Sequence, residues 1–370
     1  MKKILFAANK DTMILNMYLP YIKFFKEQNY EIHVMTNSEA KIPFSDKKIK
    51  IEYESMRKPI SKRKLIQKVR KIIQTETYER IITTTLEANT LIRMSVRKHL
   101  KKQTKITCII DKFPFYIYSN KFTYQHYFRL EKKLANYTDE LFFLNQDDYK
   151  IAKKNFKKIK KIYYSPGLGI DLSLYDQESK KEEQAKLRQT LNIKAHDFVL
   201  LYEGDLTKEN RQDWLIEALS DLFINNENFH LLLLGSDELH GKCQEMASEM
   251  GLTKQIHFLG YRTDEIEWMH IAHVALNASL DQGFPLNILK AICIGLPIIA
   301  VETRGVKDLV ITNENGFLID DKDAGELCSR ITQIYLDTAL RKKMITYNLS
   351  KRKEYALETI EPQILQQIKD

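Results

Sequence analysis

Two polar side chains, Gln282 and Lys290, flank a turn rich in glycine and proline at 283–286. The amide of Gln282 accepts a hydrogen bond without charge assistance, whereas the ammonium group of Lys290 only donates. Lys290 can therefore donate to an anion such as a phosphate, but it cannot accept a proton from a hydroxyl group.

Segments typical of buried strands alternate with helical segments along the whole chain. Strands are expected at 3–8, 31–35, 80–84 and 105–110, and again at 198–202, 229–234, 256–258, 274–276 and 297–301. Helices are expected at 19–27 and 214–222. Such alternation is typical of repeated βαβ units with a parallel sheet. We predict an α/β fold of two doubly wound, Rossmann-like domains that face each other across a cleft lined by strand ends.

The restart of this pattern sets the expected domain boundaries. A first domain is predicted at 1–164 and a second at 195–355, joined by a turn-rich and then charged connection at 165–194. A final helix is expected at 356–370, packing back on the first domain. The length of 370 residues and the apolar content of 44% suit two cores better than one.

The apolar runs and the cysteines limit the cellular compartments in which the protein is expected. No apolar run approaches the roughly 20 residues that cross a bilayer, and the N-terminal apolar stretch is too short for a signal segment. The four cysteines are far apart in apolar or helical contexts, which favours packing roles in a reducing compartment over disulfides or a zinc site. We expect a cytoplasmic protein without a metal or a cofactor.

Basic runs at 61–71, 97–105 and 153–161 concentrate positive charge in the N-terminal half of a chain whose net charge is +9. They are either solvated helix faces or surfaces for an anionic membrane or phosphate-bearing substrate. Nucleic acid ranks lower because no recognised binding motif accompanies the charge. The aromatic-rich stretch 113–128 suits core packing or an interface, and with the basic runs it predicts peripheral docking on the inner face of the plasma membrane.

The order of motifs resembles the family 4 retaining glycosyltransferases of GT-B fold from bacterial capsule and exopolysaccharide synthesis. The resemblance covers nearly the full chain and is carried by 19–34, 131–139, 145–149, 166–171, 204–212, 215–219, 260–262, 282–301, 304–305 and 314–317. It implies a nucleotide-sugar donor, a UDP-sugar before other donors, and a lipid-linked glycan acceptor.

The resemblance also implies where the donor binds. The family places cations in the segment after Gly204, but here the two positions are Asp205 and Asn210. Lys208 and Arg211 either supply the missing charge to the diphosphate or lie in water at a helix start. Gln282 and Lys290 replace two glutamates that hold the sugar and ribose, and Asp281 is a possible substitute for the first. The donor-binding residues predicted on this basis are Gly204, Lys208, Arg211, Tyr261, Gln282, Gly283, Phe284, Pro285, Leu286 and Lys290.

Histidines that the family uses near the reacting centre are absent from the corresponding loops. Asp11 persists after the first strand, and Asp111 follows the strand at 105–110. Both are candidate catalytic groups, as is Glu87, although a carboxylate at such a place more often caps a helix or a turn. His230 and His257 lie in strand contexts and are interpreted as structural.

Three functions stay open on these residues. The first is a glycosyltransferase that moves a sugar from a nucleotide-diphosphate donor to a lipid-linked glycan in cell-surface polysaccharide synthesis. The second is a catalytically inactive relative that binds an active glycosyltransferase or a glycan, because the replacements fall on every group that aids transfer. The third is a binding module for another nucleotide.

Overall fold

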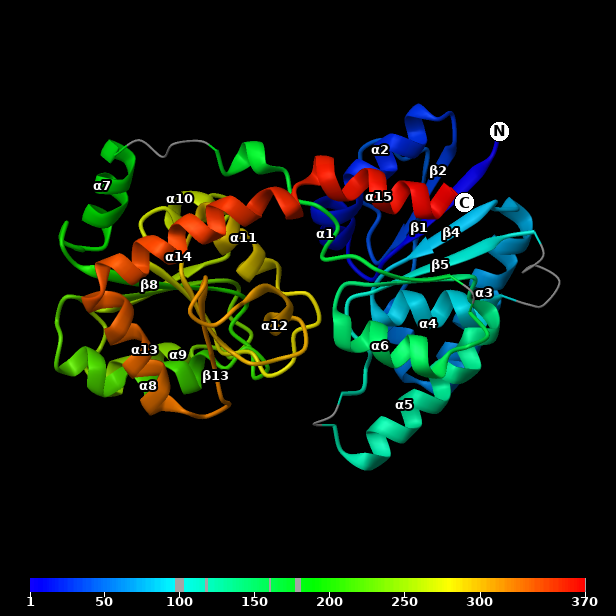
Figure 1. Ribbon diagram of the computed structural model, residues 1–370. Helices are drawn as coiled ribbons and strands as arrows, with labels where there is room; N and C mark the ends of the chain where they lie inside the picture. Colours follow the sequence, from blue (N-terminus) through cyan, green and yellow to red (C-terminus); the bar gives the residue numbers. More distant parts are fainter. Residues whose placement is uncertain (97–102, 117–118, 160, 177–180, 370) are drawn as a thin grey trace. The chain divides into compact units, whose positions relative to one another are not determined.

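The computed structural model describes residues 1–96, 103–116, 119–159, 161–176 and 181–369 (Figure 1). Its contacts divide the chain into an N-terminal unit, Met1–Gly169 with Leu357–Asp370, and a C-terminal unit, Ile170–Ala356. The connection expected at 165–194 is thus split between the units, and it contains a helix, α7 (Lys181–Thr190). The final helix, α15 (Leu357–Lys369), is grouped with the N-terminal unit.

The N-terminal unit is built on a seven-stranded parallel sheet with the order β3-β2-β1-β4-β5-β6-β7. The strands are β1 (Lys3–Ala7), β2 (Glu31–Thr36), β3 (Lys47–Lys50), β4 (Arg80–Thr83), β5 (Lys105–Ile110), β6 (Glu140–Phe143) and β7 (Lys161–Tyr164). The main helices are α2 (Leu19–Glu27), α3 (Pro59–Glu76), α4 (Leu86–Ser95), α5 (Lys121–Leu134), α6 (Gln146–Asn155) and α15, with a short α1 (Asp11–Met13). Strands β1, β2, β4 and β5 confirm the expected ones.

The C-terminal unit is built on a six-stranded parallel sheet with the order β10-β9-β8-β11-β12-β13. The strands are β8 (Phe198–Glu203), β9 (Phe229–Leu234), β10 (Ile256–Gly260), β11 (Val274–Asn277), β12 (Ile298–Val301) and β13 (Gly316–Ile319). The helices are α7, α8 (Gln212–Ile224), α9 (Lys242–Glu249), α10 (Glu265–Met269), α11 (Leu286–Ile294), α12 (Val306–Leu309), α13 (Ala324–Leu336) and α14 (Thr338–Lys351). Two Rossmann-like sheets therefore confirm the predicted doubly wound architecture.

Continuous apolar runs explain why these strands are central. All six residues of β9 are buried, and β8 is buried from Phe198 to Tyr202, as expected for strands covered on both faces. By contrast, β3 has the sequence Lys-Lys-Ile-Lys and no buried residue. An edge strand tolerates such a polar sequence, but the hydrophobic periodicity of the sequence does not predict a strand there.

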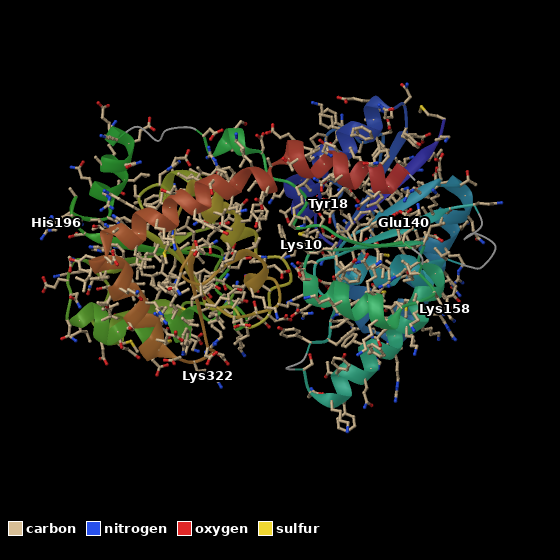
Figure 2. All side chains as sticks on the ribbon, in the orientation of Figure 1. Lys10, Tyr18, Glu140, Lys158, His196 and Lys322 are labelled. Carbon is tan, nitrogen blue, oxygen red and sulfur yellow. The ribbon has the colours of Figure 1, made fainter. Side chains whose placement is uncertain are left out.

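A buried ion pair fastens α15 to the N-terminal sheet. The guanidinium of Arg80, at the start of β4, donates to Glu140 of β6, labelled in Figure 2, and to the carbonyl of Ile368. It also donates to Oγ1 of Thr107, 2.5 Å away. These bonds satisfy a charge that would be costly to bury alone.

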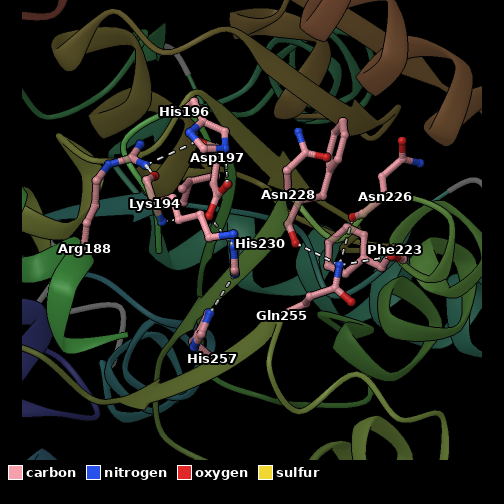
Figure 3. Close-up of polar contacts among 12 residues, drawn as sticks. Arg188, Lys194, His196, Asp197, Phe223, Asn226, Asn228, His230, Gln255 and His257 are labelled. Carbon is pink, nitrogen blue, oxygen red and sulfur yellow. Dashed lines mark hydrogen bonds and ion pairs between the residues drawn. The ribbon is translucent and has the colours of Figure 1, made fainter. Parts of the chain in front are cut away.

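Three titratable side chains meet where strands of the C-terminal sheet begin (Figure 3). Nε2 of His230 lies 3.1 Å from Oδ2 of Asp197, and its Nδ1 lies 3.2 Å from Nε2 of His257. Burial lowers the pKa of His230 although Asp197 opposes the shift. Burial, and then the neighbouring His230, lowers the pKa of His257 to about 4. These histidines are neutral parts of the structure near neutral pH.

Among the described residues, no helix combines the length and apolar character needed to cross a bilayer. Most of the basic run at 97–105, parts of 113–128 and 153–161, residues 177–180 of the expected connection, and the last residue of 356–370 lie outside the described residues.

Candidate functional site

Close backbone contacts shape the carboxyl edge of the C-terminal sheet. A Cβ on Gly235 would lie 2.3 Å from the carbonyl oxygen of Gly204, directly after β8. A Cβ on Gly305 would lie 2.0 Å from the carbonyl oxygen of Gly283, and the N–H of Gly305 donates to the carbonyl of Gln282. Only glycine fits at these two contacts, so the loops after β8, β9, β11 and β12 are tightly packed.

Helix α11 begins at this edge, directly after the predicted turn. Pro285 is its N-cap residue and makes no side-chain cap bond. In the first turn, the N–H of Leu286 donates to the carbonyl of Phe284 over 3.1 Å, and the N–H of Ile288 donates to Oδ1 of Asn287 over 2.9 Å. The helix dipole favours an anion at this end, where the N–H groups of Leu286 and Ile288 are already bonded within the protein. Gly283, Phe284, Pro285 and Leu286 thus lie where backbone groups can meet a phosphate.

Amide side chains fix the turn before α11. Nδ2 of Asn277, the last residue of β11, donates to Oε1 of Gln282 over 2.7 Å. Nδ2 of Asn287 donates to the carbonyl of Glu203 over 2.8 Å, which ties α11 to β8. The acceptor oxygen of Gln282 is therefore already engaged within the protein. A neighbouring ion pair fixes the same loops, because the buried Arg304 lies 2.6 Å from Oδ1 of Asp281.

Lys290 lies between two carboxylates. Its Nζ lies 2.5 Å from Oε1 of Glu203 and 3.0 Å from Oε1 of Glu265. Burial lowers the pKa of Lys290, but the charges and hydrogen bonds of both glutamates outweigh it, so the net shift is upward. Burial raises the pKa of Glu203 although Lys290 opposes it. This pairing argues against the phosphate-binding role predicted for Lys290.

Several polar atoms near this edge have no hydrogen-bond partner within the described residues. They are Oε2 of Glu203, Oγ of Ser279 and Oγ1 of Thr303, all shielded from solvent. Ser279 and Thr303 each lie two residues beyond the ends of neighbouring strands, β11 and β12. Buried polar atoms are normally bonded, so this edge has unused hydrogen-bonding capacity.

The two predicted cations after Gly204, Lys208 and Arg211, differ in whether other side chains of the protein already engage them. Arg211 directly precedes α8 and has a φ of 58°. Its guanidinium group forms an ion pair with Asp321 and lies 4.5 Å from the ring centre of Trp214. Lys208 is exposed and makes no ion pair with the described residues. Lys208 is thus the freer of the two cations. Tyr261, which follows β10, is 70% exposed.

The candidate catalytic carboxylates belong to the N-terminal unit. Asp11 accepts hydrogen bonds from Thr36, Ser38 and Lys48. Burial raises the pKa of Asp11, but these bonds outweigh it and leave the pKa below its usual range. An acceptor held in this way is a weak base, which favours a structural role.

Asp111 lies directly after β5, and its carbonyl accepts from Nδ2 of Asn145 over 2.8 Å. Nδ2 of Asn9, in the loop after β1, donates over 3.1 Å to Oε2 of Glu87, in the first turn of α4. The hydroxyl of Tyr18, a residue labelled in Figure 2, donates to Thr84, and burial raises the pKa of Tyr18. The loops after β1 and β4 thus share polar contacts, and no histidine takes part in them.

One group could hold a metal by composition. Ligand atoms of Glu31, His33 and Glu76 lie within 4.8 Å of one another. Lys3 and Lys47 already pair with Glu76, and hydrogen bonding first by Lys3 lowers the pKa of Glu76 to about 2. The group is therefore accounted for as an ion-pair network.

Sequence reasoning missed Glu203 and Glu265. Glu203 lies between the predicted strand 198–202 and Gly204, and this position is the signal that could have identified it. Glu265 carried no comparable signal, because its pairing with Lys290 joins α10 to α11 only in the folded chain.

The chain is similar to known glycosyltransferases. Residues 183–351 match the family described as glycosyl transferases group 1. The chain is 29% identical to the putative glycosyltransferase EpsD of Bacillus subtilis, over 93% of this chain and 90% of EpsD. It is 26% identical to the UDP-Gal:alpha-D-GlcNAc-diphosphoundecaprenol alpha-1,3-galactosyltransferase of Escherichia coli, over 76% and 75% of the two chains.

The fold is that of HepE from Anabaena, whose crystal structure contains UDP-glucose. The two structures share 20% sequence identity and a TM-score of 0.79, and each chain is covered completely. Among the other relatives, CapM of Staphylococcus aureus is a capsular polysaccharide biosynthesis glycosyltransferase, and the relatives from Escherichia coli and Campylobacter jejuni are named for acceptors linked to diphosphoundecaprenol. The chain therefore has the GT-B fold, and its residues 183–351 are similar to the glycosyl transferases group 1 family.

Proposed function

We propose that the chain transfers a sugar from a nucleotide-diphosphate donor to a lipid-linked glycan in cell-surface polysaccharide synthesis. The observation that carries the proposal is the position of the start of α11 at the glycine-lined edge of the C-terminal sheet. Such an edge suits a diphosphate because closely packed backbone and helix N–H groups can approach it. A UDP-sugar is the first donor to test, since HepE binds UDP-glucose and the Escherichia coli relative uses UDP-Gal.

In the proposed reaction, the bond between the anomeric carbon and the diphosphate oxygen breaks. An acceptor hydroxyl oxygen bonds to that carbon, and the hydroxyl proton passes to the departing diphosphate. Negative charge gathers on the leaving group, so groups that meet it selectively in the transition state accelerate the step. The start of α11 and the exposed ammonium of Lys208 are assigned to this task.

An acceptor in a membrane would require docking of the N-terminal unit, and α5 offers a surface for it. Phe122, Gln125, His126, Arg129 and Lys133 line one groove on this helix, at spacings that place them on one face. Phe122 is 86% exposed. An exposed aromatic beside cations suits an anionic bilayer surface, and we assign this face to the inner membrane leaflet.

A second candidate, the inactive relative, is favoured by one observation. Asp205 and Asn210 stand where the family resemblance places cations, and Arg211 is paired with Asp321. The experiment that separates the two is a thermal-shift panel of UDP-, GDP- and ADP-sugars, followed by a transfer assay on lipid-linked glycans. Stabilisation with transfer supports the enzyme. Stabilisation without turnover or donor hydrolysis supports the inactive relative, and no stabilisation by any donor contradicts the proposed function.

A further inference from the structure

Glu203, Glu265 and Lys290 come from three elements of the C-terminal unit and form one charged cluster. Glu203 ends β8, Glu265 begins α10, and Lys290 lies in the second turn of α11. All three side chains are largely buried, with 21%, 25% and 13% of their surface exposed, respectively. When both carboxylates are ionised, the single ammonium group leaves the cluster one negative charge in excess.

The cluster retains free acceptor capacity after this pairing. Lys290 contacts Oε1 of each glutamate, and Oε2 of Glu203 is shielded from solvent without a hydrogen-bond partner among the described residues. A carboxylate oxygen left without a donor in such a place is costly. A ligand hydroxyl would satisfy it.

The cluster lies about one helical turn beyond the start of α11. Lys290 is four residues from Leu286, a rise of about 6 Å along the helix. Asn287, at the start of the same helix, is bonded to the carbonyl of Glu203. A diphosphate at the start of α11 would therefore have its ribose within reach of the two carboxylates.

We propose that Glu203 and Glu265 accept the ribose hydroxyls of the nucleotide donor, and that Lys290 positions both carboxylates. The proposal rests on the proposed function. It moves the acceptor role from residue 290 of α11 to β8 and α10. The lysine at position 290, where the family resemblance places a glutamate, would then leave nucleotide recognition intact. Glu203 and Glu265 would supply the carboxylate that this glutamate provides in the family.

The test compares ribose and deoxyribose forms of one nucleotide by calorimetry. UDP and 2′-deoxy-UDP are titrated into the full chain and into E203Q, E265Q and E267Q, with the GDP and ADP pairs used if UDP does not bind. The wild type should prefer the ribose form by about 10-fold or more, as expected for a hydrogen bond to a charged acceptor. E203Q or E265Q should lose most of that preference. E267Q changes an exposed carboxylate on the same helix and should keep it.

The role of Lys290 is tested with K290M and K290R. K290M should raise the pH above which the ribose preference appears, because two carboxylates without their cation ionise less readily together. K290R should restore the wild-type pH profile. Thermal melting identifies any variant that fails to fold. If one glutamate variant fails to fold, the ribose preference of the other glutamate variant decides whether the proposal holds.

The outcomes separate the two proposals. If no nucleotide binds, the proposed function fails and this inference fails with it. If a nucleotide binds but the ribose preference survives in both glutamate variants, only the inference is overturned. A preference that disappears in E203Q or E265Q and persists in E267Q supports both.

Discussion

The ammonium nitrogen of Lys290 lies 2.5 Å from Oε1 of Glu203, which joins α11 to the carboxyl end of β8. The two charged groups are largely buried, so neither has water to replace its partner. This relationship makes residue 290 a structural cation of the C-terminal unit. Its consequences for stability can be measured without knowledge of the substrate.

Lys290→Glu should destabilise the C-terminal unit by about 3–5 kcal/mol, since it breaks a buried pair and places three carboxylates together. Urea unfolding followed by tryptophan fluorescence measures the change. Lys343→Glu is the matched control, because Lys343 and Glu314 form an exposed pair that should cost about 1 kcal/mol or less. Equal effects of the two substitutions would show that Lys290 is not held as described.

Stability should fall as the pH decreases from about 6.5, the usual pKa of histidine, towards 4. The folded-state pKa of His257 is about 4, and that of His230 is also lowered, so the unfolded chain binds more protons in this range. Above the unfolded-state pKa both states are neutral at these histidines and stability no longer depends on them. Urea unfolding at a series of pH values measures the slope.

His257→Gln should reduce the pH slope of stability, because one titrating group is removed. His196→Gln is the control, since the His196 side chain is 76% exposed. If His257→Gln leaves the slope between pH 6.5 and pH 4 unchanged, the buried pair with His230 does not govern it.

Gly305→Ala should destabilise the protein by roughly 1–3 kcal/mol or more, as overpacking does, and should weaken nucleotide binding. The new Cβ would lie 2.0 Å from the carbonyl oxygen of Gly283, so the turn before α11 must move. Gly325→Ala is the matched control in α13, where the nearest atom lies 3.5 Å from the new Cβ. Thermal melting with and without UDP measures both effects, and a Gly305→Ala variant as stable as wild type would refute this packing.

Sequence periodicity was sufficient for the fold but only partly for the site. Buried apolar runs such as β9 predict central strands directly, whereas β3 and β7 are too polar or too short to be recognised. The turn at 283–286 was found because glycine and proline mark it. The partners of Lys290 were not found, because they lie 87 and 25 residues away in sequence and meet it only after folding.

Lys208→Met should lower kcat of the proposed transfer by about 100-fold and change donor affinity less. The reason is that a cation aimed at the leaving diphosphate acts mainly as its charge develops, and one such stabiliser contributes on the order of 3 kcal/mol. Lys342→Met removes an exposed cation of α14 and should leave the rate unchanged. Steady-state kinetics with the donor identified by thermal shift measures both. Equal rates for the two variants would remove Lys208 from the mechanism.

The exposed face of α5 should bind vesicles that contain anionic lipid and ignore neutral ones. Arg129→Ala with Lys133→Ala should weaken binding by about 30-fold, since each basic side chain near an anionic surface contributes about 1 kcal/mol. Phe122→Ala should weaken it further, because an 86% exposed phenyl ring would lose its contact with the acyl region. Lys254→Ala with Lys342→Ala removes the same charge from exposed positions of the C-terminal unit and should have little effect. Co-sedimentation at low and high salt measures vesicle binding by the wild type, the α5 double variant, the Phe122→Ala variant and the control double variant. Equal losses from both double variants would mean that net charge, rather than the α5 face, directs the protein to the lipid.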